Sequence, residues 1–199
     1  MSTVEHAEQS HHLPPAKVAS QQRRAVLFFI LADAVFFASM LFTYFYLRSL
    51  NVNGGWLPDG AKTADAWLVW LIAGVVVVSA LAYRSGEMGI RSGSTARLQT
   101  GTLLGLLVMV AAVALSIYQF ATWPILMSDG SYASIFIVMA WVQFVHLLIV
   151  LFVGIGIWNR AGRGLIDQHN DAHVTVVGHW WYWVTLTAVL GALLTFFVR

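Results

Sequence analysis

Long apolar stretches alternate with short polar segments along the chain. Five of these stretches reach the roughly 20 residues that a helix needs to cross the hydrocarbon core of a membrane. None shows the two-residue alternation of a membrane-barrel strand, so we predict transmembrane helices at residues 25–47, 66–83, 100–123, 132–158 and 180–198. The predicted fold class is all-α: a polytopic bundle of five membrane helices, residues 25–199, preceded by a polar, flexible tail, residues 1–24.

The composition narrows the chemistry that the chain can perform. Hydrophobic residues make up 59% of the sequence and charged residues 10%, whereas soluble domains carry about 25% charged residues. Cysteine is absent, which excludes disulfides, thiolate nucleophiles, iron–sulfur clusters and metal sites built on cysteine sulfur. The net charge of +2 is small, so nucleic acid is not expected as a partner.

The basic residues predict the orientation of the bundle, because Lys and Arg are retained on the cytoplasmic side of a membrane. One side of the predicted bundle holds most of them: Lys17, Arg23, Arg24, Arg84, Arg91, Arg97, Arg160 and Arg163. The other side holds Arg48, Lys62 and Arg199. We therefore expect the N-terminus inside and the C-terminus outside.

Few strongly polar side chains fall within the predicted spans: Asp33, Gln119, Gln143 and His146. An ionisable group at this depth costs about 3 kcal/mol on insertion scales, so it usually faces protein and marks a functional hypothesis. At 1.5 Å per residue, Asp33 lies about 12 Å and His146 about 18 Å from the inner ends of their helices. These two residues can therefore meet as a structural or proton-holding pair. The alternative is a protonated Asp33 that hydrogen-bonds a nearby backbone group or hydroxyl.

The histidines do not suit a redox cofactor. A haem with two axial histidines needs both at membrane depth, and only His146 lies well inside a predicted span, since the others fall in tails or loops. His169 and His173 have a spacing that suits metal ligands on a helix, but a third ligand is missing. We therefore expect no metal site and no catalytic residue in this chain.

Two further patterns concern packing. Gly101 and Gly105 form a GxxxG pattern in the third span, and Gly154 and Gly156 lie in the fourth; such glycines allow helices to approach closely. The aromatic run at residues 179–184 opens the last span. We expect it to act as an anchor at the membrane interface.

Several of these residues resemble the motifs of one family, subunit III of the haem–copper oxidases, which comprise the cytochrome c and quinol oxidases. The first helix of five-helix members carries a carboxylate followed by an aromatic pair, as Asp33 is followed by Phe36 and Phe37. The third helix of the family has a Gln, here Gln119, and three residues later a Glu, where this chain has Thr122.

The last two spans extend the resemblance. The family pattern there is Tyr-Gly-Ser-x-Phe, then two histidines three apart, and finally Trp-Tyr-Trp-His with an Asp three residues further on. The matching positions are Tyr132, Ser134, Phe136, His146, Trp181, Tyr182 and Trp183. The chain departs from the pattern at Ala133, Gln143, Val184 and Thr187, and so it resembles a divergent, five-helix, bacterial-type member.

The resemblance implies a non-catalytic subunit that packs beside the catalytic subunit I and other subunits of an oxidase. Such a subunit stabilises the catalytic one and supports its proton uptake during oxygen reduction in aerobic electron transport. Haem and copper are then expected in the partner subunits, and the chain in a bacterial inner membrane. Phospholipid is expected in a cleft between the first two helices and the other three. Two alternatives stay open: an accessory protein of nitric oxide reductase, and a small proton-coupled transporter that uses Asp33 and His146.

Overall fold

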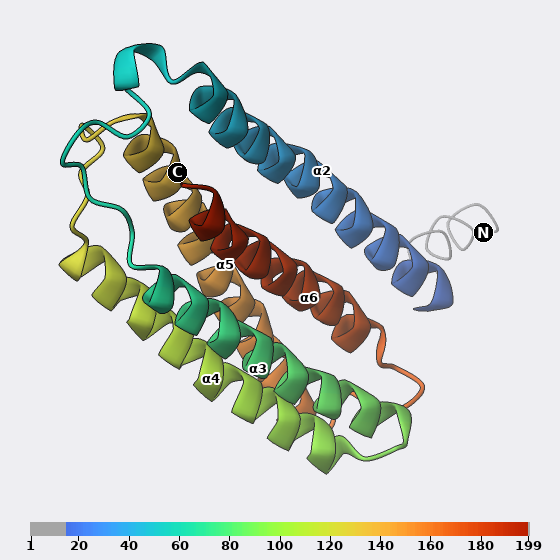
Figure 1. Cartoon of the computed structure of the whole chain (residues 1–199). Coiled ribbons are helices and arrows are strands. Elements are labelled where there is room, and N and C mark those ends of the chain that lie inside the picture. The colour runs from blue at the N-terminus through green and yellow to red at the C-terminus, as the bar shows by residue number, and fades with distance from the viewer. Residues whose placement is uncertain (1–14, 199) are drawn as a thin grey trace, which may run out of the picture.

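The computed structural model describes residues 15–198, and helices account for most of this range (Figure 1). The five long helices are α2 (Pro15–Leu50), α3 (Ala66–Arg91), α4 (Thr95–Thr122), α5 (Ser131–Gly162) and α6 (Ala172–Leu193). Short 3-10 segments, η2 (Val52–Gly54) and η3 (Leu194–Phe197), follow α2 and α6. Within the described range no strand occurs, and five helices are long and apolar enough to cross a membrane. The all-α prediction and the number of helices are therefore confirmed.

The helices extend past the predicted spans at one end of the bundle. We call this the arginine-rich end; it comprises the start of α2, the turn between α3 and α4, and the loop between α5 and α6. Here α2 begins at Pro15 rather than at residue 25, α3 continues to Arg91 rather than to 83, and α6 begins at Ala172 rather than at 180. Apolar length matches the hydrocarbon core of the membrane, whereas a polar helix can continue beyond it.

The boundary predicted for the tail is wrong at residues 15–24. Its residues 15–24 belong to α2, while residues 1–14 lie outside the described range, as does Arg199. At the opposite end of the bundle, which holds residues 51–65, residues 123–130 and the C-terminus, the helix ends fall close to the predicted limits.

The helices are arranged around α6, which packs against α2, α3 and α5. In Figure 1, α2 lies on one side of α6, and α3 with α4 lies on the other. The helix α4 packs against α3 and α5, and α2 packs against α5 and α6. The grouping of the first two helices apart from the other three, expected from the resemblance, is thus not observed, because α3 packs against α4 and α6.

The closest helix pair is α3–α4, where glycines face each other. A Cβ atom added to Gly101 would lie 2.6 Å from the backbone N of Gly86. In the same pair, the Ser79 hydroxyl donates to the Gly105 carbonyl at 2.7 Å. The GxxxG pattern of Gly101 and Gly105 therefore lies at a helix contact, as expected. The close approach predicted at Gly156 is wrong, because nothing lies within 4 Å of the position where its Cβ would be.

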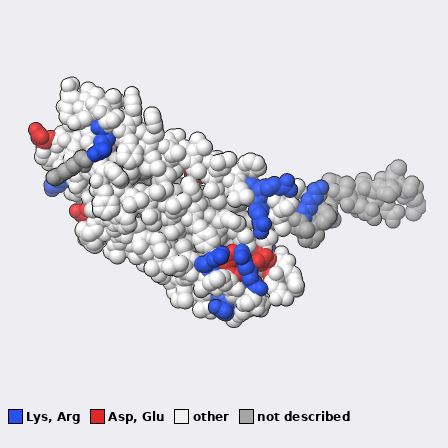
Figure 2. Space-filling model, turned by 45° about the vertical axis from the view of Figure 1, so that its right-hand side comes forward, with Lys and Arg blue, Asp and Glu red and all other residues white. Residues whose placement is uncertain are grey.

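The surface divides into an uncharged middle and charged ends. Figure 2 shows a broad white band across the molecule, with the blue and red atoms gathered at its two extremities. Large apolar side chains such as Phe28, Phe42 and Phe152 are 70%, 69% and 80% exposed. Such a belt fits the hydrocarbon interior of a bilayer, where backbone groups are satisfied within helices and apolar side chains face lipid.

Candidate functional site

The most polar contact within the spans joins three helices. The Nε2 atom of His146 on α5 lies 3.2 Å from Oδ1 of Asp33 on α2. The indole Nε1–H of Trp183 on α6 donates to Oδ2 of the same carboxylate at 2.6 Å. Both carboxylate oxygens thus have a partner, and we call these three residues the Asp33 cluster. The structure brings the two members of the predicted pair together and adds an indole donor that the sequence did not indicate.

Aromatic rings enclose the Asp33 cluster. The His146 ring meets Trp180 edge-on, with centroids 5.4 Å apart, and Trp183 meets Phe37 at 6.5 Å. The side chains of Asp33 and His146 are only 13% and 8% exposed. Because Asp33 is acceptor-only when ionised and Trp183 donor-only, the arrangement suits a carboxylate bound between an indole and an imidazole. Neither a backbone group nor a hydroxyl is its partner among the described residues, which was the alternative arrangement.

A second polar contact lies one helical turn from the Asp33 cluster, toward the opposite end. The Thr187 hydroxyl donates to Oε1 of Gln143 at 3.0 Å, and Nε2 of Gln143 donates to the Val184 carbonyl at 3.2 Å. Gln143, Val184 and Thr187 are three of the positions at which the chain departs from the family pattern. These departures therefore meet in space, where uncharged groups hydrogen-bond one another.

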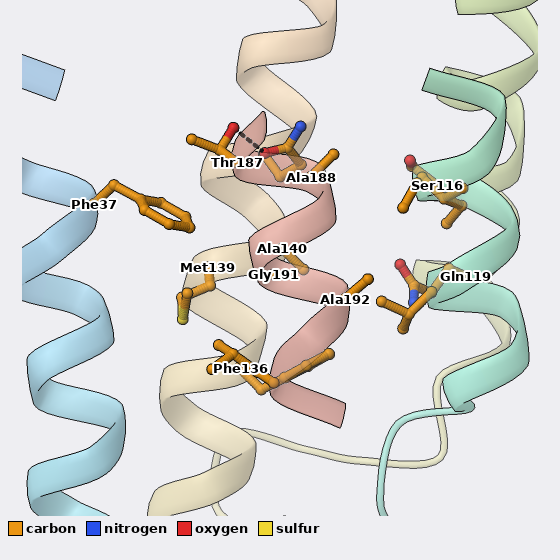
Figure 3. A pocket seen from close by; sticks show the side chains of 15 residues that line it. Phe37, Ser116, Gln119, Phe136, Met139, Ala140, Thr187, Ala188, Gly191 and Ala192 are labelled. Carbon is orange, nitrogen blue, oxygen red and sulfur yellow. Dashed lines mark hydrogen bonds between the residues drawn. The ribbon is translucent and has the colours of Figure 1, made fainter. Parts of the chain in front are cut away.

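A cavity of about 70 Å³ adjoins this contact. All five long helices contribute to its lining, including Phe37 from α2, Ile72 from α3, Gln119 from α4 and Gln143 from α5. Figure 3 shows Ser116 and Gln119 directed from α4 toward α6. The Gln119 side chain is buried, with 7% exposure, and no other described residue hydrogen-bonds it.

Sequence analysis missed a third polar contact, at the arginine-rich end. Glu87 on α3 is 2% exposed and accepts hydrogen bonds from Arg84 at 3.0 Å and Arg91 at 2.5 Å. The Tyr182 hydroxyl on α6 also donates to it, at 2.5 Å. Residue 87 falls between the predicted spans 66–83 and 100–123, because the apolar stretch ends before it. The spacing of Arg84, Glu87 and Arg91 could have revealed it, since residues three and four apart share a helix face.

The aromatic run of α6 is not an interfacial anchor. Trp180 and Trp181 are buried, with 5% and 0% exposure, because α6 lies in the middle of the bundle. The Trp181 indole donates to the Ser79 hydroxyl at 3.2 Å and stacks on Tyr83 with centroids 4.4 Å apart. A Cβ on Gly154 would lie 3.0 Å from the Trp181 ring, so that glycine leaves room for the indole.

The motif residues at the start of α5 hold the opposite end together. The buried Tyr132 hydroxyl accepts from the Ala64 amide at 3.2 Å, and its ring packs against Trp56 and Phe136. The Ser134 hydroxyl donates to the Met127 carbonyl at 2.6 Å. These positions therefore join the connecting segments to the bundle and lie apart from the Asp33 cluster.

The histidines are placed differently from the expectation. His173 and His179 lie in α6, because that helix begins at Ala172, whereas His169 lies in the loop before it. His169 and His173 are thus not on one helix. Over residues 15–198, no three side chains of His, Cys, Asp or Glu gather as a metal-binding group.

The fold and these contacts define a class: a multi-pass helical membrane protein whose buried polar side chains join helices to one another. The model of the family described as "Cytochrome c oxidase subunit III" matches residues 3–198. The chain therefore belongs to the cytochrome c oxidase subunit III family, and the resemblance inferred from its motifs is confirmed.

Individual relatives carry the same description. A "Cytochrome c oxidase subunit 3" of Trichophyton rubrum is 27% identical over 161 residues, which cover 76% of this chain and 58% of the relative. Proteins of that name from Prototheca wickerhamii and Saccharomyces cerevisiae are 21% and 20% identical, covering 88% and 76% of this chain. The chain thus spans little more than half the length of the Trichophyton rubrum relative.

Proposed function

We propose that this chain is the non-catalytic subunit III of a respiratory haem–copper oxidase in aerobic electron transport. The observation that carries the proposal is the family match, which extends over residues 3–198. In this role the chain packs beside the catalytic subunit I and other subunits, stabilises the catalytic subunit and supports its proton uptake. Haem and copper then belong to the partner subunits and phospholipid to the lipid-facing surface of this chain.

The Asp33 cluster supports a structural role first. Its three side chains come from α2, α5 and α6, so the cluster ties the least covered helix to the rest of the bundle. Polar contacts between membrane helices are favourable because an unpaired polar group in hydrocarbon is costly. A proton-holding role uses the same pair, since His146 and Asp33 can share one proton along their 3.2 Å contact.

The membrane and the orientation also belong to the proposal. Arginines concentrate at the end that holds the start of α2, which supports an inward N-terminus. The five-helix pattern is the basis for a bacterial plasma membrane, whereas the relatives named above come from eukaryotes. Immunogold or protease-protection mapping of a tag placed before Pro15 tests the inward N-terminus.

The partners decide between the proposed function and its alternatives. The tagged chain is purified from its native membranes in mild detergent, and a reduced-minus-oxidised spectrum and the accompanying proteins are recorded. Haem a or haem o together with a large multi-helix catalytic subunit is the expected result. A co-purifying haem b reductase would favour the nitric oxide reductase alternative instead. A colourless protein without partners would favour the transporter and contradict an oxidase subunit.

A further inference from the structure

The cavity beside Gln119 contains polar groups whose hydrogen-bonding capacity is not used within the described protein. A glutamine amide has two N–H donors and a carbonyl with two lone pairs. Gln119 is 7% exposed and lines the cavity, yet none of these groups is bonded to a described residue. Burial of an amide without a partner is strongly unfavourable. The amide therefore needs a partner other than the side chains and backbone of residues 15–198.

The rest of the lining offers positions for such a partner. The Ser116 hydroxyl donates to the Ala112 carbonyl at 2.9 Å, which leaves its oxygen free to accept. Gln143 uses one N–H for the Val184 carbonyl and one lone pair for Thr187, so it keeps one donor and one acceptor. Polar groups on α4 and α5 thus border the same space, while apolar side chains make up the remaining wall.

The size of the cavity indicates that it can hold water. Its volume is about 70 Å³, and a water molecule in the liquid takes about 30 Å³, with three hydrogen bonds as the typical number for a buried water. The space therefore has room for more than one water molecule, with polar side chains on part of its wall. Apolar cavities stay dry, but a site with several polar partners does not.

We propose that this cavity is a water-binding site, in which bound water links the Gln119 amide on α4 to the Gln143–Thr187 contact on α5 and α6. The position is specific. Phe37, Gln143 and Thr187 lie one helical turn from Asp33, His146 and Trp183, respectively, on the same three helices. The bound water thus lies one helical turn from the Asp33 cluster, toward the opposite end of the bundle.

The direct test is a high-resolution cryo-EM map of the purified native complex or the full chain. Ordered water density within hydrogen-bond distance of the Gln119 amide is the expected result. A cavity without density, or one with the continuous density of an acyl chain, would overturn the proposal. Wild-type protein suffices for this test, so it does not depend on the folding of any variant.

A substitution with a matched control tests the proposal independently, because a hydrated site and a dry site predict opposite changes of the melting temperature. If the site holds water, Gln119→Leu removes an amide that hydrogen-bonds this water. We then expect the melting temperature in detergent to fall by about 2–4 °C. In a dry site the same change would remove an unpaired amide and raise the melting temperature. Gln99→Leu is the control, because it makes the same replacement on α4 at the arginine-rich end, outside the cavity lining. An increase for Gln119→Leu relative to this control would contradict the proposal.

Discussion

The α3–α4 pair and α2 are held in the bundle by different physical means. Of the 18 consecutive residues that are most apolar in each helix, 39% are buried in α3 and 44% in α4. The corresponding share in α2 is 11%. The α3–α4 contact is made by glycines whose backbones nearly touch. The α2 contact includes a carboxylate that is bonded to His146 and Trp183.

This difference follows from what drives helix association in lipid. Lipid tails are as apolar as leucine, so burial of apolar side chains gives little advantage there. Close packing of backbones and hydrogen bonds between helices remain as the attractive terms. The α3–α4 pair relies mainly on the first and α2 depends more on the second. A change of shape should therefore damage α3–α4, and a change of polarity should damage α2.

The largest effect is expected from Gly101→Val. Its Cβ would lie 2.6 Å from both the N and Cα atoms of Gly86, and backbone atoms cannot move aside as a flexible side chain can. We expect a loss of about 3 kcal/mol or more, at the upper end for overpacked sites. The measurement is the yield of monodisperse protein and its melting temperature in mild detergent.

Gly156→Val is the matched control for this substitution. Gly156 is also a helical glycine, but nothing lies within 4 Å of the position where its Cβ would be. Both variants change helix propensity and side-chain volume equally. Equal melting temperatures for the two variants would mean that the glycine contact does not hold α3 against α4.

A smaller effect is expected when Asp33 loses its polarity. Asp33→Leu leaves the Trp183 N–H and the His146 Nε2 atom without their partner, which we expect to cost about 2 kcal/mol, since an orphaned buried polar group costs about 1–3 kcal/mol. Asp33→Asn retains an oxygen for Trp183 and gains an N–H for His146, so it should preserve most of the stability. Melting temperatures of the two variants, measured side by side, check this order.

A double-mutant cycle tests whether the pair acts as a unit. The single variants Asp33→Leu and His146→Leu are compared with the double variant, and contacting residues are expected to show a non-additive free energy of unfolding. Strictly additive losses would show that Asp33 and His146 stabilise α2 independently, contrary to the contact in the structure.

Much of this architecture was predictable from the sequence, because the membrane imposes simple rules. Apolar length indicated the five helices, and depth along two of them placed Asp33 close enough to His146 for the two to meet. The helix ends at the arginine-rich end were predicted wrongly, since hydropathy reports the hydrocarbon core and not where backbone hydrogen bonds stop. The partner Trp183 was not predicted, because the rotation of α6 depends on how all five helices pack.

The prediction that residues 179–184 form an interfacial anchor was wrong for the same reason, since it also depended on how the helices pack. Tryptophans near the end of a span usually mark the membrane interface, and nothing in the local sequence distinguishes a buried run from such an anchor. Only the central place of α6 in the bundle directs Trp181 against Ser79 and Tyr83. A single sequence therefore does not predict the role of a side chain when that role depends on neighbours distant in sequence.

The smallest effect is expected from Glu87→Gln, which alters a polar contact between α3 and α6. The neutral amide can still accept the Tyr182 hydrogen bond but loses its charge opposite Arg84 and Arg91, whose side chains are 45% and 48% exposed. Solvent screens these arginines, so we expect a loss of about 1 kcal/mol rather than the full value of a buried pair. Melting temperatures at low and high salt measure it, with the exposed Asp59→Asn as control. A loss as large as that of Asp33→Leu would show that polarity holds the α3 side of the bundle as much as it holds α2.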